Sequence, residues 1–375
     1  MLQDELSYFF TECPTLNEQV DVFNTSLPQQ WLDEAFALTG SVTIRRRKIA
    51  PEDVIRLVIG MSLMRHEPIQ EIAARLAFKS KQLDNTLAAR SSISNARQRI
   101  GSAPVEWLFN RCADHWSSQS HTDELWNGLN LFSIDRTEDT PECREHFGSA
   151  NSKGELVSSY PAFRLACLMN VRNHLIIRAA HGRFREGEIT LASQLIDNVP
   201  ANSVLLMDRL YHSAELLHHI ETLGQNRFWV TPLKRDIKFN VIEHYSDNDM
   251  LVERELSSHA RKKSPSLPRY WQMRVVKYQI EGFEPRLIAT SLPQDKYSAE
   301  DIIKLYHERW EIELGYREIK KTLLKNAITL RSKKPDPVVQ ELYGMLIAYN
   351  LIRHEAALAS DVVKVRPTRI SFKTA

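Results

Sequence analysis

The first third of the chain has apolar residues that recur every three or four positions, which is the period of an amphipathic α-helix. Helices are predicted over residues 51–64, 68–76 and 91–100. Pro51 suits the first turn of a helix, and the two acids after it are favourable at the positive end of the helix dipole. Residues 1–122 are therefore predicted to form a helical N-terminal domain.

After residue 128 the pattern changes to short apolar runs between polar turns, which are typical of buried strands. Strands are predicted over residues 129–134, 162–169, 174–180 and 203–207, with a helix over residues 186–196. Asp135 and Asp208 directly follow the first and the fourth of these strands. An aspartate at the end of a buried strand often caps the next turn, so each residue alone also has a purely structural explanation.

A second group of strand-like runs fills residues 225–297 and is interpreted as a β-rich insertion. Its strands are predicted over residues 228–231, 238–242, 271–279 and 285–290, with the basic segment 261–263 in a loop. Two helices follow the insertion, one around Glu313 and the other over residues 337–358.

The helix around Glu313 carries side chains of different chemistry on one stripe. Tyr306, Arg309, Glu313 and Lys320 are separated by 3, 4 and 7 residues, so on an α-helix they fall within an arc of roughly 60°. A single carboxylate flanked by phosphate-binding groups suits metal-dependent chemistry on a nucleic-acid backbone. A helix with solvated charges is the alternative, and the spacing alone does not decide between them. The neighbouring apolar stripe and the acids that point away are Leu305, Ile312, Tyr316, Ile319 and Leu323, and Glu308, Glu311 and Glu318.

Charge is distributed unevenly along a chain whose net charge is only +2. Residues 1–40 have seven acids and no Lys or Arg, whereas residues 41–100 have 12 Lys and Arg against five acids. Residues 304–334 have nine Lys and Arg against four acids. Any one basic segment is usually a solvated surface, but two of them, one across the Glu313 helix, indicate a localised surface for DNA.

Composition excludes several other classes of protein. With 375 residues, 43% hydrophobic and 26% charged, the chain has the composition of a globular protein with two or three domains. The four cysteines are dispersed, which fits neither a zinc knuckle nor a disulfide framework and predicts free thiols in a reducing cytoplasm. No apolar run is long enough to cross a membrane, and the acidic N-terminus does not resemble a secretory signal.

Four segments together resemble the insertion-sequence-four family of bacterial transposases, which belongs to the Asp-Asp-Glu class. They are the Tyr-x2-Arg-x3-Glu-x6-Lys pattern, the segments that end in Asp135 and Asp208, and the helix over residues 341–353. The resemblance runs from about residue 40 almost to the end of the chain. Arg136 and Leu210 depart from the pattern, because the family usually has glycine at both positions, next to the metals.

This resemblance implies an α/β fold with a ribonuclease-H-like (integrase-like) catalytic core. The core would comprise residues 123–224 and 298–375, interrupted by the insertion and preceded by the helical domain. Asp135, Asp208 and Glu313 would be the catalytic residues and the ligands of two Mg²⁺ ions, which Mn²⁺ can replace. Carboxylate oxygens suit such hard cations, so neither His181 nor His212 is given a ligand role.

The resemblance also implies roles in DNA binding. Arg309 and Lys320 would bind phosphates of the transposon end, and Tyr306 would position the terminal strand. Trp271 would stack on a flipped end base, although Trp229 is an alternative and either ring could belong to the strand core. Residues 91–100 resemble a recognition helix in which Asn95, Arg97 and Arg99 reach DNA, unless these helices form only a packing unit.

The predicted function is cut-and-paste DNA transposition. The partners would be double-stranded DNA, as terminal inverted repeats and target, and a second copy of the chain in a synaptic complex at the bacterial nucleoid; no membrane partner is expected. Arg136 and Leu210 motivate an alternative: a DNA-binding remnant or repressor without catalysis. A hydrolytic nuclease of the same fold is a third possibility.

Overall fold

The computed structural model describes residues 26–41, 49–76, 89–119, 124–139, 163–183, 185–279, 286–324 and 330–373. The chain divides into two compact units. The first unit comprises residues 1–121, 140–146 and 317–375, and the second comprises residues 122–139 and 147–316. No helix in the described ranges is long and apolar enough to cross a membrane.

The first unit is helical and is organised around one long helix, α14 (Pro335–Val363), which is buried along most of its length. Gly344 allows α14 to approach α4 closely, because a Cβ there would lie 2.6 Å from the Val58 side chain. A buried salt bridge of 2.8 Å also joins Arg65, just after α4, to Glu341 on α14. The shorter elements of this unit are α3 (Gln29–Leu38), α4 (Pro51–Leu63), α5 (Ile69–Arg75), α6 (Arg90–Ile100), α7 (Ala103–Ser117), η3 (Glu318–Leu323) and η4 (Pro367–Arg369).

The second unit is built on a nine-stranded mixed sheet with the order β3-β2-β1-β4-β5-β9-β8-β7-β6. Strands β1, β4 and β5 are parallel, and β2 and β3 extend the β1 edge antiparallel to one another. This arrangement is the ribonuclease-H-like core, and β6 to β9 continue its sheet beyond β5. The strands are β1 (Asn130–Asp139), β2 (Phe163–Asn170), β3 (Ile176–Arg183), β4 (Ser203–Met207), β5 (Arg227–Pro232), β6 (Asn240–Ser246), β7 (Asp249–Glu255), β8 (Tyr270–Tyr278) and β9 (Arg286–Thr290).

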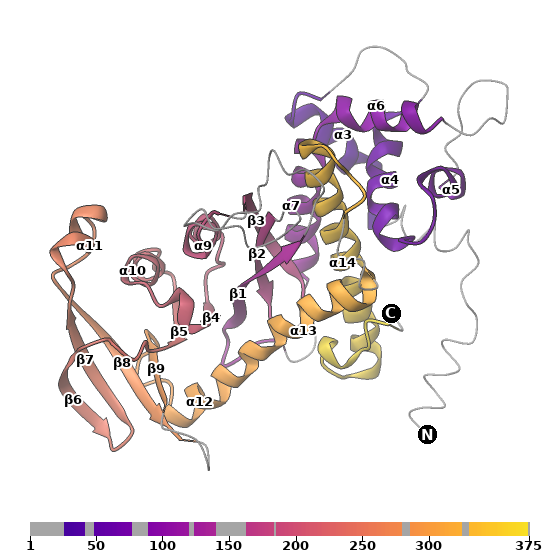
Figure 1. Cartoon of the computed structure of the whole chain (residues 1–375). Coiled ribbons are helices and arrows are strands. Elements are labelled where there is room, and N and C mark those ends of the chain that lie inside the picture. The colour runs from indigo at the N-terminus through magenta and orange to yellow at the C-terminus, as the bar shows by residue number, and fades with distance from the viewer. Residues whose placement is uncertain are drawn as a thin grey trace. The chain divides into compact units, whose positions relative to one another are not determined.

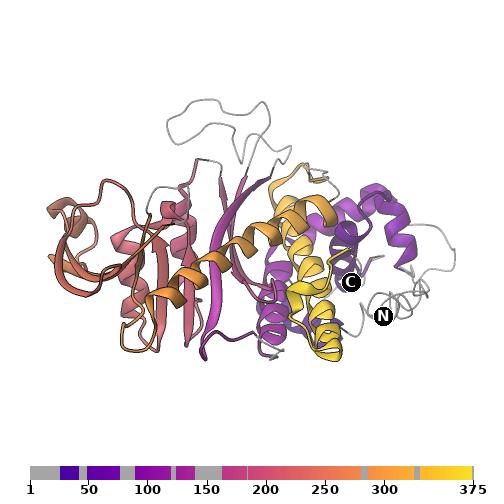
Figure 2. The same cartoon turned by 90° about the horizontal axis from the view of Figure 1, so that it is seen from below.

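Helices cover both faces of this sheet (Figure 1). On one face, α9 (Glu188–Ile196) and α10 (Ala214–Thr222) pack against residues such as Leu205 and Met207. On the other face, α12 (Ala299–His307) packs against Val204 and Leu206, and Figure 2 shows it crossing the strands. Alternate residues of β4 thus face opposite layers, which is why its sequence is apolar throughout.

The Glu313 helix is irregular. After α12 come a 3-10 turn, η2 (Glu308–Trp310), a short α-helix, α13 (Glu311–Arg317), and the π-helical η3. The predicted stripe assumed 100° per residue throughout, which holds in α-helix but not in 3-10 or π-helix. All five residues of the predicted apolar stripe are nevertheless buried.

Most predicted elements are present within a few residues. Helix α10 was not among them, and three further differences concern α11, β7 and β1. The basic segment 261–263 is helical, in α11 (Ser258–Lys263), and β7 has no counterpart among the predicted strands. Strand β1 continues four residues beyond Asp135, because β2 pairs with it as far as Asp139. Pairing with β2 therefore extends β1 beyond the end of its apolar run at Ile134.

Candidate active site

Asp135 and Asp208 occupy equivalent positions on neighbouring parallel strands. The β1–β4 pairing ends at Ile134 opposite Met207, so each aspartate is the next residue after the last pair. The Ser133 hydroxyl donates a 2.7 Å hydrogen bond to the Leu206 carbonyl just before this point and fixes the register. Both aspartates are half-buried. In open α/β sheets, ligands bind at the carboxyl ends of parallel strands, which is where these two acids lie.

Asp208 is also held by its own loop. Its carboxylate accepts a 2.5 Å hydrogen bond from the Leu210 backbone amide and so caps the short η1 turn (Arg209–Tyr211). Its backbone carbonyl accepts a 2.9 Å hydrogen bond from the Thr231 hydroxyl on β5. The structural explanation considered for this residue is therefore correct, but capping uses one carboxylate oxygen and leaves acceptor capacity on the other.

Glu313 is on a helix that is joined to the Asp135 strand. Tyr316, one turn after Glu313, donates a 2.6 Å hydrogen bond from its hydroxyl to the Asp135 backbone carbonyl. Burial, followed by the nearby Cys167 and Asp135, raises the pKa of Tyr316 well above its ordinary value, so this phenol stays a neutral donor. The role of Tyr316 was not predicted, because an apolar-stripe tyrosine gives no sequence signal of its hydroxyl partner.

The Glu313 carboxylate is paired with Arg309, 3.0 Å away and one turn earlier. The Arg309 guanidinium also lies 6.0 Å from the centre of the Tyr306 ring. Burial opposes the charge on Arg309, but Tyr306 and Glu313 together outweigh it and raise its pKa. Burial raises the pKa of Tyr306, and Asp208 is among the charges that act on this phenol. Tyr306, Arg309 and Glu313 therefore form one connected polar group.

The other acids of this helical segment have structural partners. Glu308 makes a two-pronged contact with Arg172, with distances of 2.8 and 2.9 Å. Glu311 lies 3.0 Å from the His174 ring, and in the first unit Glu318 is paired with Arg353. Each of these three carboxylates thus has a partner of its own; that they point away from the Glu313 stripe stays a prediction.

Asp135, Asp208 and Glu313 have the oxygen donors that hard divalent cations prefer. Two of them follow neighbouring parallel strands and the third is on the helix that Tyr316 joins to Asp135, so the type of donor, carboxylate oxygen, suits such ions. In the described part of the chain, no three His, Cys, Asp or Glu side chains are already gathered tightly enough to hold a metal. The Arg309 contact with Glu313 neutralises the third acid in this arrangement.

Lys320 belongs to the first unit and is exposed in the π-helical η3. Its spacing from Glu313 therefore does not follow the regular α-helical rotation that the prediction assumed.

Arg97 is not available to DNA in this structure, contrary to its predicted role. It is 6% exposed on α6 and donates hydrogen bonds to Ser332, Pro337 and Gln340 at 2.8 to 3.2 Å. Position 97 lies on the same helical face as the buried Ile93 and Ile100, which explains its burial. Asn95 is exposed on the same helix and Arg99 is half-buried.

Trp271 likewise has a structural position. It is 3% exposed, and its ring lies 5.7 Å from that of Trp229. The two indole N–H groups donate to the two oxygens of Glu221, each at 3.0 Å. Burial raises the pKa of Glu221, and the indole hydrogen bonds oppose that shift. The alternative considered for both tryptophans, that they belong to the core, is correct here.

The family usually has glycine where this chain has Arg136 and Leu210, but the backbone of this chain does not need glycine at either position. Among the described residues with positive φ, neither Arg136 nor Leu210 is present. Arg136 continues strand β1, and Leu210 lies in the η1 turn with its side chain 44% exposed. Because neither position needs the left-handed region, other residues fit there without backbone strain.

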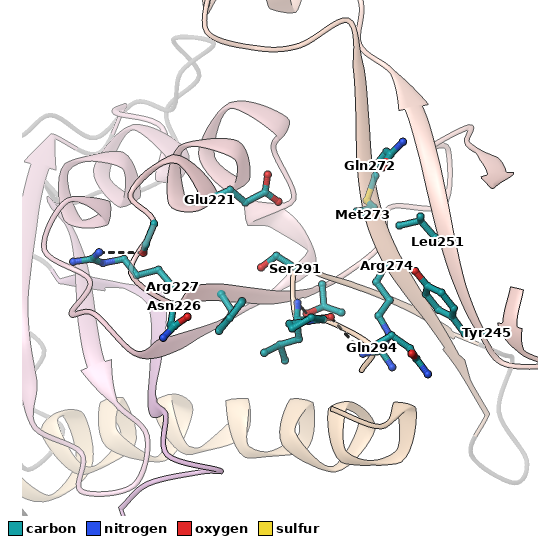
Figure 3. A pocket seen from close by; sticks show the side chains of 15 residues that line it. Glu221, Asn226, Arg227, Tyr245, Leu251, Gln272, Met273, Arg274, Ser291 and Gln294 are labelled. Atoms are coloured by element: carbon teal, nitrogen blue, oxygen red, sulfur yellow. Dashed lines mark hydrogen bonds between the residues drawn. The ribbon is translucent and has the colours of Figure 1, made fainter. Parts of the chain in front are cut away.

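The second unit also has a cavity of about 430 Å³. Figure 3 shows the side chains that line it. Its lining includes Asn226, Arg227 and Phe228 at the start of β5, and Arg274, which is buried and paired with Asp249. The aspartates are at the opposite end, where β4 and β5 finish. This cavity is therefore separate from the candidate active site.

Comparison with known proteins agrees with the geometry. Residues 126–351 match the family described as "Transposase DDE domain", and residues 17–110 match "Insertion element 4 transposase N-terminal". "Transposase InsG for insertion sequence element IS4" of Escherichia coli (strain K12) is 35% identical over 92% of this chain and 79% of that protein. "Putative transposase InsZ" of the same strain is 36% identical over 59% of this chain and 74% of that protein.

A solved structure of a piggyBac transposase synaptic complex with hairpin DNA is also similar. It covers 95% of this chain and 75% of that chain, with 13% identity and a TM-score of 0.43, which is too low to support an inference. The family match over most of the chain and the extensive identity to InsG carry the assignment. This chain belongs to the IS4 family of DDE transposases.

Proposed function

We propose that this protein cuts the ends of its own insertion element and joins them to target DNA, with Asp135, Asp208 and Glu313 as its catalytic residues. The observation that supports this best is the position of the two aspartates after the last β1–β4 pair, with the Glu313 helix joined to Asp135 through Tyr316. The DDE family uses divalent metal ions. We propose Mg²⁺, which Mn²⁺ can replace, held by the three acids.

Paired divalent ions at such a site would polarise the scissile phosphate and stabilise charge on the attacking and leaving oxygens. The residues around the acids have separate tasks. Arg309 would exchange its contact with Glu313 for a phosphate of the bound strand, and Tyr306, whose raised pKa keeps it neutral, would orient that strand. Lys320 would contribute a further phosphate contact.

The proposed reaction needs no covalent enzyme intermediate. Water attacks the phosphodiester at the element's end and releases a 3′-hydroxyl. That hydroxyl attacks the opposite strand, which forms a hairpin on the element and displaces the flanking DNA. A second water opens the hairpin, and the freed 3′-hydroxyl attacks target DNA. Double-stranded inverted repeats, target DNA and a second copy of the chain are the proposed partners.

The test is cleavage of duplex DNA that carries the inverted repeats flanking this reading frame. We expect nicked, hairpin and double-strand-break products with Mg²⁺ or Mn²⁺, and none with a chelator. Glu313→Gln should lower the rate at least about a thousandfold, because it removes a charged ligand but keeps the shape. Glu311→Gln is the matched control, two residues away on the same helix, and should retain cleavage.

Undiminished cleavage by Glu313→Gln would overturn the role given to that carboxylate. A protein that binds the repeats equally well with chelator and never cuts them would instead be a repressor. Cleavage without hairpin or strand-transfer products would identify a hydrolytic nuclease.

A further inference from the structure

The helical segment that carries Glu313 is attached to strand β1 by polar contacts at both of its ends. At the first end, the Arg172 guanidinium contacts both carboxylate oxygens of Glu308, at 2.8 and 2.9 Å. The residue before Arg172, Val171, donates a 3.0 Å hydrogen bond from its backbone amide to the Leu131 carbonyl near the start of β1. The beginning of the segment is therefore held beside the beginning of β1.

At the second end, the Tyr316 hydroxyl donates its 2.6 Å hydrogen bond to the Asp135 backbone carbonyl. The β1–β4 pairing stops one residue earlier, so no residue of β4 pairs with Asp135. Tyr316 is 6% exposed, and Cys167, which pairs with Asp135 on β2, is fully buried, so water has little access to this bond. The hydroxyl thus holds β1 at the point where the strand loses its parallel neighbour.

The two attachments are spaced alike on the helical segment and on the strand. Over residues 308–316 a helix rises by about 12 Å, and over residues 131–135 a strand rises by about 13 Å. The apolar contacts of the segment, such as those of the buried Ile312, have no preferred direction and would let it slide along the sheet. The polar contacts at its ends instead fix the position of the segment relative to β1.

We propose that Tyr316 is a positioning residue of the active site. Its hydrogen bond to Asp135 sets the separation between Glu313 and the aspartates, and this separation sets the affinity for the metal ions. Glu313 and Tyr316 are three residues apart on α13, so they lie on neighbouring turns of one helical face. Groups that orient metal ligands in this way are worth about 10- to 100-fold in metal affinity or activity. The inference rests on the proposed function, because it takes the three acids as the metal ligands.

The first test is binding of Mn²⁺ to the full chain, measured from the electron paramagnetic resonance signal of the free ion. Glu313→Gln identifies the part of the binding that belongs to this site. Tyr316→Phe, which keeps the buried ring and removes only the hydroxyl, should weaken that part about 10- to 100-fold. Tyr343→Phe is the matched control, since this buried tyrosine donates a 2.8 Å hydrogen bond to Glu106 within the first unit. It should keep the Mn²⁺ affinity, although both Phe variants should melt about 2 °C lower.

The second test is single-turnover cleavage of the repeat-carrying duplex, measured as a function of Mg²⁺ concentration. Tyr316→Phe should need about tenfold more Mg²⁺ to reach half of its maximal rate. Its affinity for the duplex in chelator should equal that of Tyr343→Phe. Equal Mn²⁺ affinity and equal Mg²⁺ response in the two Phe variants would show that Tyr316 only stabilises the fold. Weaker DNA binding by Tyr316→Phe in chelator would show that the hydroxyl acts on DNA; either result overturns the inference.

Failure of this inference can be distinguished from failure of the proposed function. If the unmodified protein cleaves its repeats and Tyr316→Phe responds to both ions as the unmodified protein does, the positioning role is wrong and the transposase reaction stands. If Tyr316→Phe weakens Mn²⁺ binding and the unmodified protein never cleaves its repeats, the positioning role is correct and the reaction is wrong.

Discussion

Two regions of this protein hold basic side chains in different surroundings. On α6, Arg97 is almost fully buried and donates to one backbone carbonyl and two side-chain oxygens. By contrast, Lys234, which lies 3.4 Å from the Leu210 carbonyl, and Arg254 on β7 are only half-buried, and no carboxylate of the described residues pairs with them. Arg97 thus has its hydrogen-bond partners within the chain, whereas Lys234 and Arg254 remain partly in contact with water.

The difference shows why a basic residue in a predicted DNA-binding segment is weak evidence for contact with DNA. A buried guanidinium with all its partners contributes to folding, and removing it leaves acceptors unsatisfied. Lys234 and Arg254 have no carboxylate partner among the described residues and remain partly in contact with water. The available partners, and not the residue type, separate the two roles.

The largest effect should come from Arg97→Ala. This change leaves Gln340 and Ser332 without their buried donor and should lower the free energy of unfolding by about 3 kcal/mol, as measured by urea denaturation. The slope of log DNA affinity against log salt concentration, which reports phosphate contacts, should not change. Arg90→Ala, at an exposed position on the same helix, is the control and should leave stability nearly intact. If Arg97→Ala kept its stability but reduced this slope, Arg97 would be a contact to DNA and not a structural residue.

A smaller effect should come from His212, which should make the free energy of unfolding fall at acidic pH. Burial, then Arg254 and Lys234, lowers the pKa of His212 to about 3 from 6.5. Between these values the unfolded chain binds a proton that the folded chain does not, so stability falls as pH drops below 6.5. The expected loss at pH 5 is about 2 kcal/mol.

His212→Leu should remove this part of the pH dependence, which urea unfolding at pH 5 and pH 7 would measure. His219→Leu, at an exposed histidine on α10, is the control and should keep the dependence of the unmodified protein. If His212→Leu lost stability in the same way between these two values of pH, His212 would not be the buried neutral group described above.

The smallest effect should come from Asn95→Ala. Asn95 is exposed on the same helix as Arg97, so its contact with DNA stays a prediction. Losing one such hydrogen bond should weaken binding to the repeats by about 1 kcal/mol, or roughly fivefold, without changing the melting temperature. Unchanged affinity would indicate that α6 is a packing helix only.

Much of the fold was predictable because strands and helices have different apolar periods. Strand β4 was predicted at its observed bounds, and the strands before it within a few residues. Helix α11 and strand β7 were missed, since a run of three basic residues and a strand with alternating charges give weak local signals. The 3-10 and π-helical turns of the Glu313 helix were also missed, because the prediction assumed an α-helical rotation of 100° per residue throughout.

The residue types at the candidate site were all readable from the chain, since Asp135, Asp208 and the Tyr-Arg-Glu-Lys pattern are local in sequence. Their partners were not. Whether Arg97 meets solvent or Gln340, and whether Trp271 meets a base or Glu221, depends on residues far away in sequence. Periodicity reports only the face on which a residue lies, and the same apolar face can carry a buried arginine or tryptophan.

The chain alone established which acids, cations and rings exist and the elements that carry them, because those properties depend on neighbours within a few residues. Only the folded arrangement decided that Asp135 and Asp208 follow neighbouring parallel strands, that Tyr316 joins the Glu313 helix to Asp135, and that Arg97 is buried against Gln340. Such contacts come from strand register and from packing between distant segments, and no local pattern encodes them.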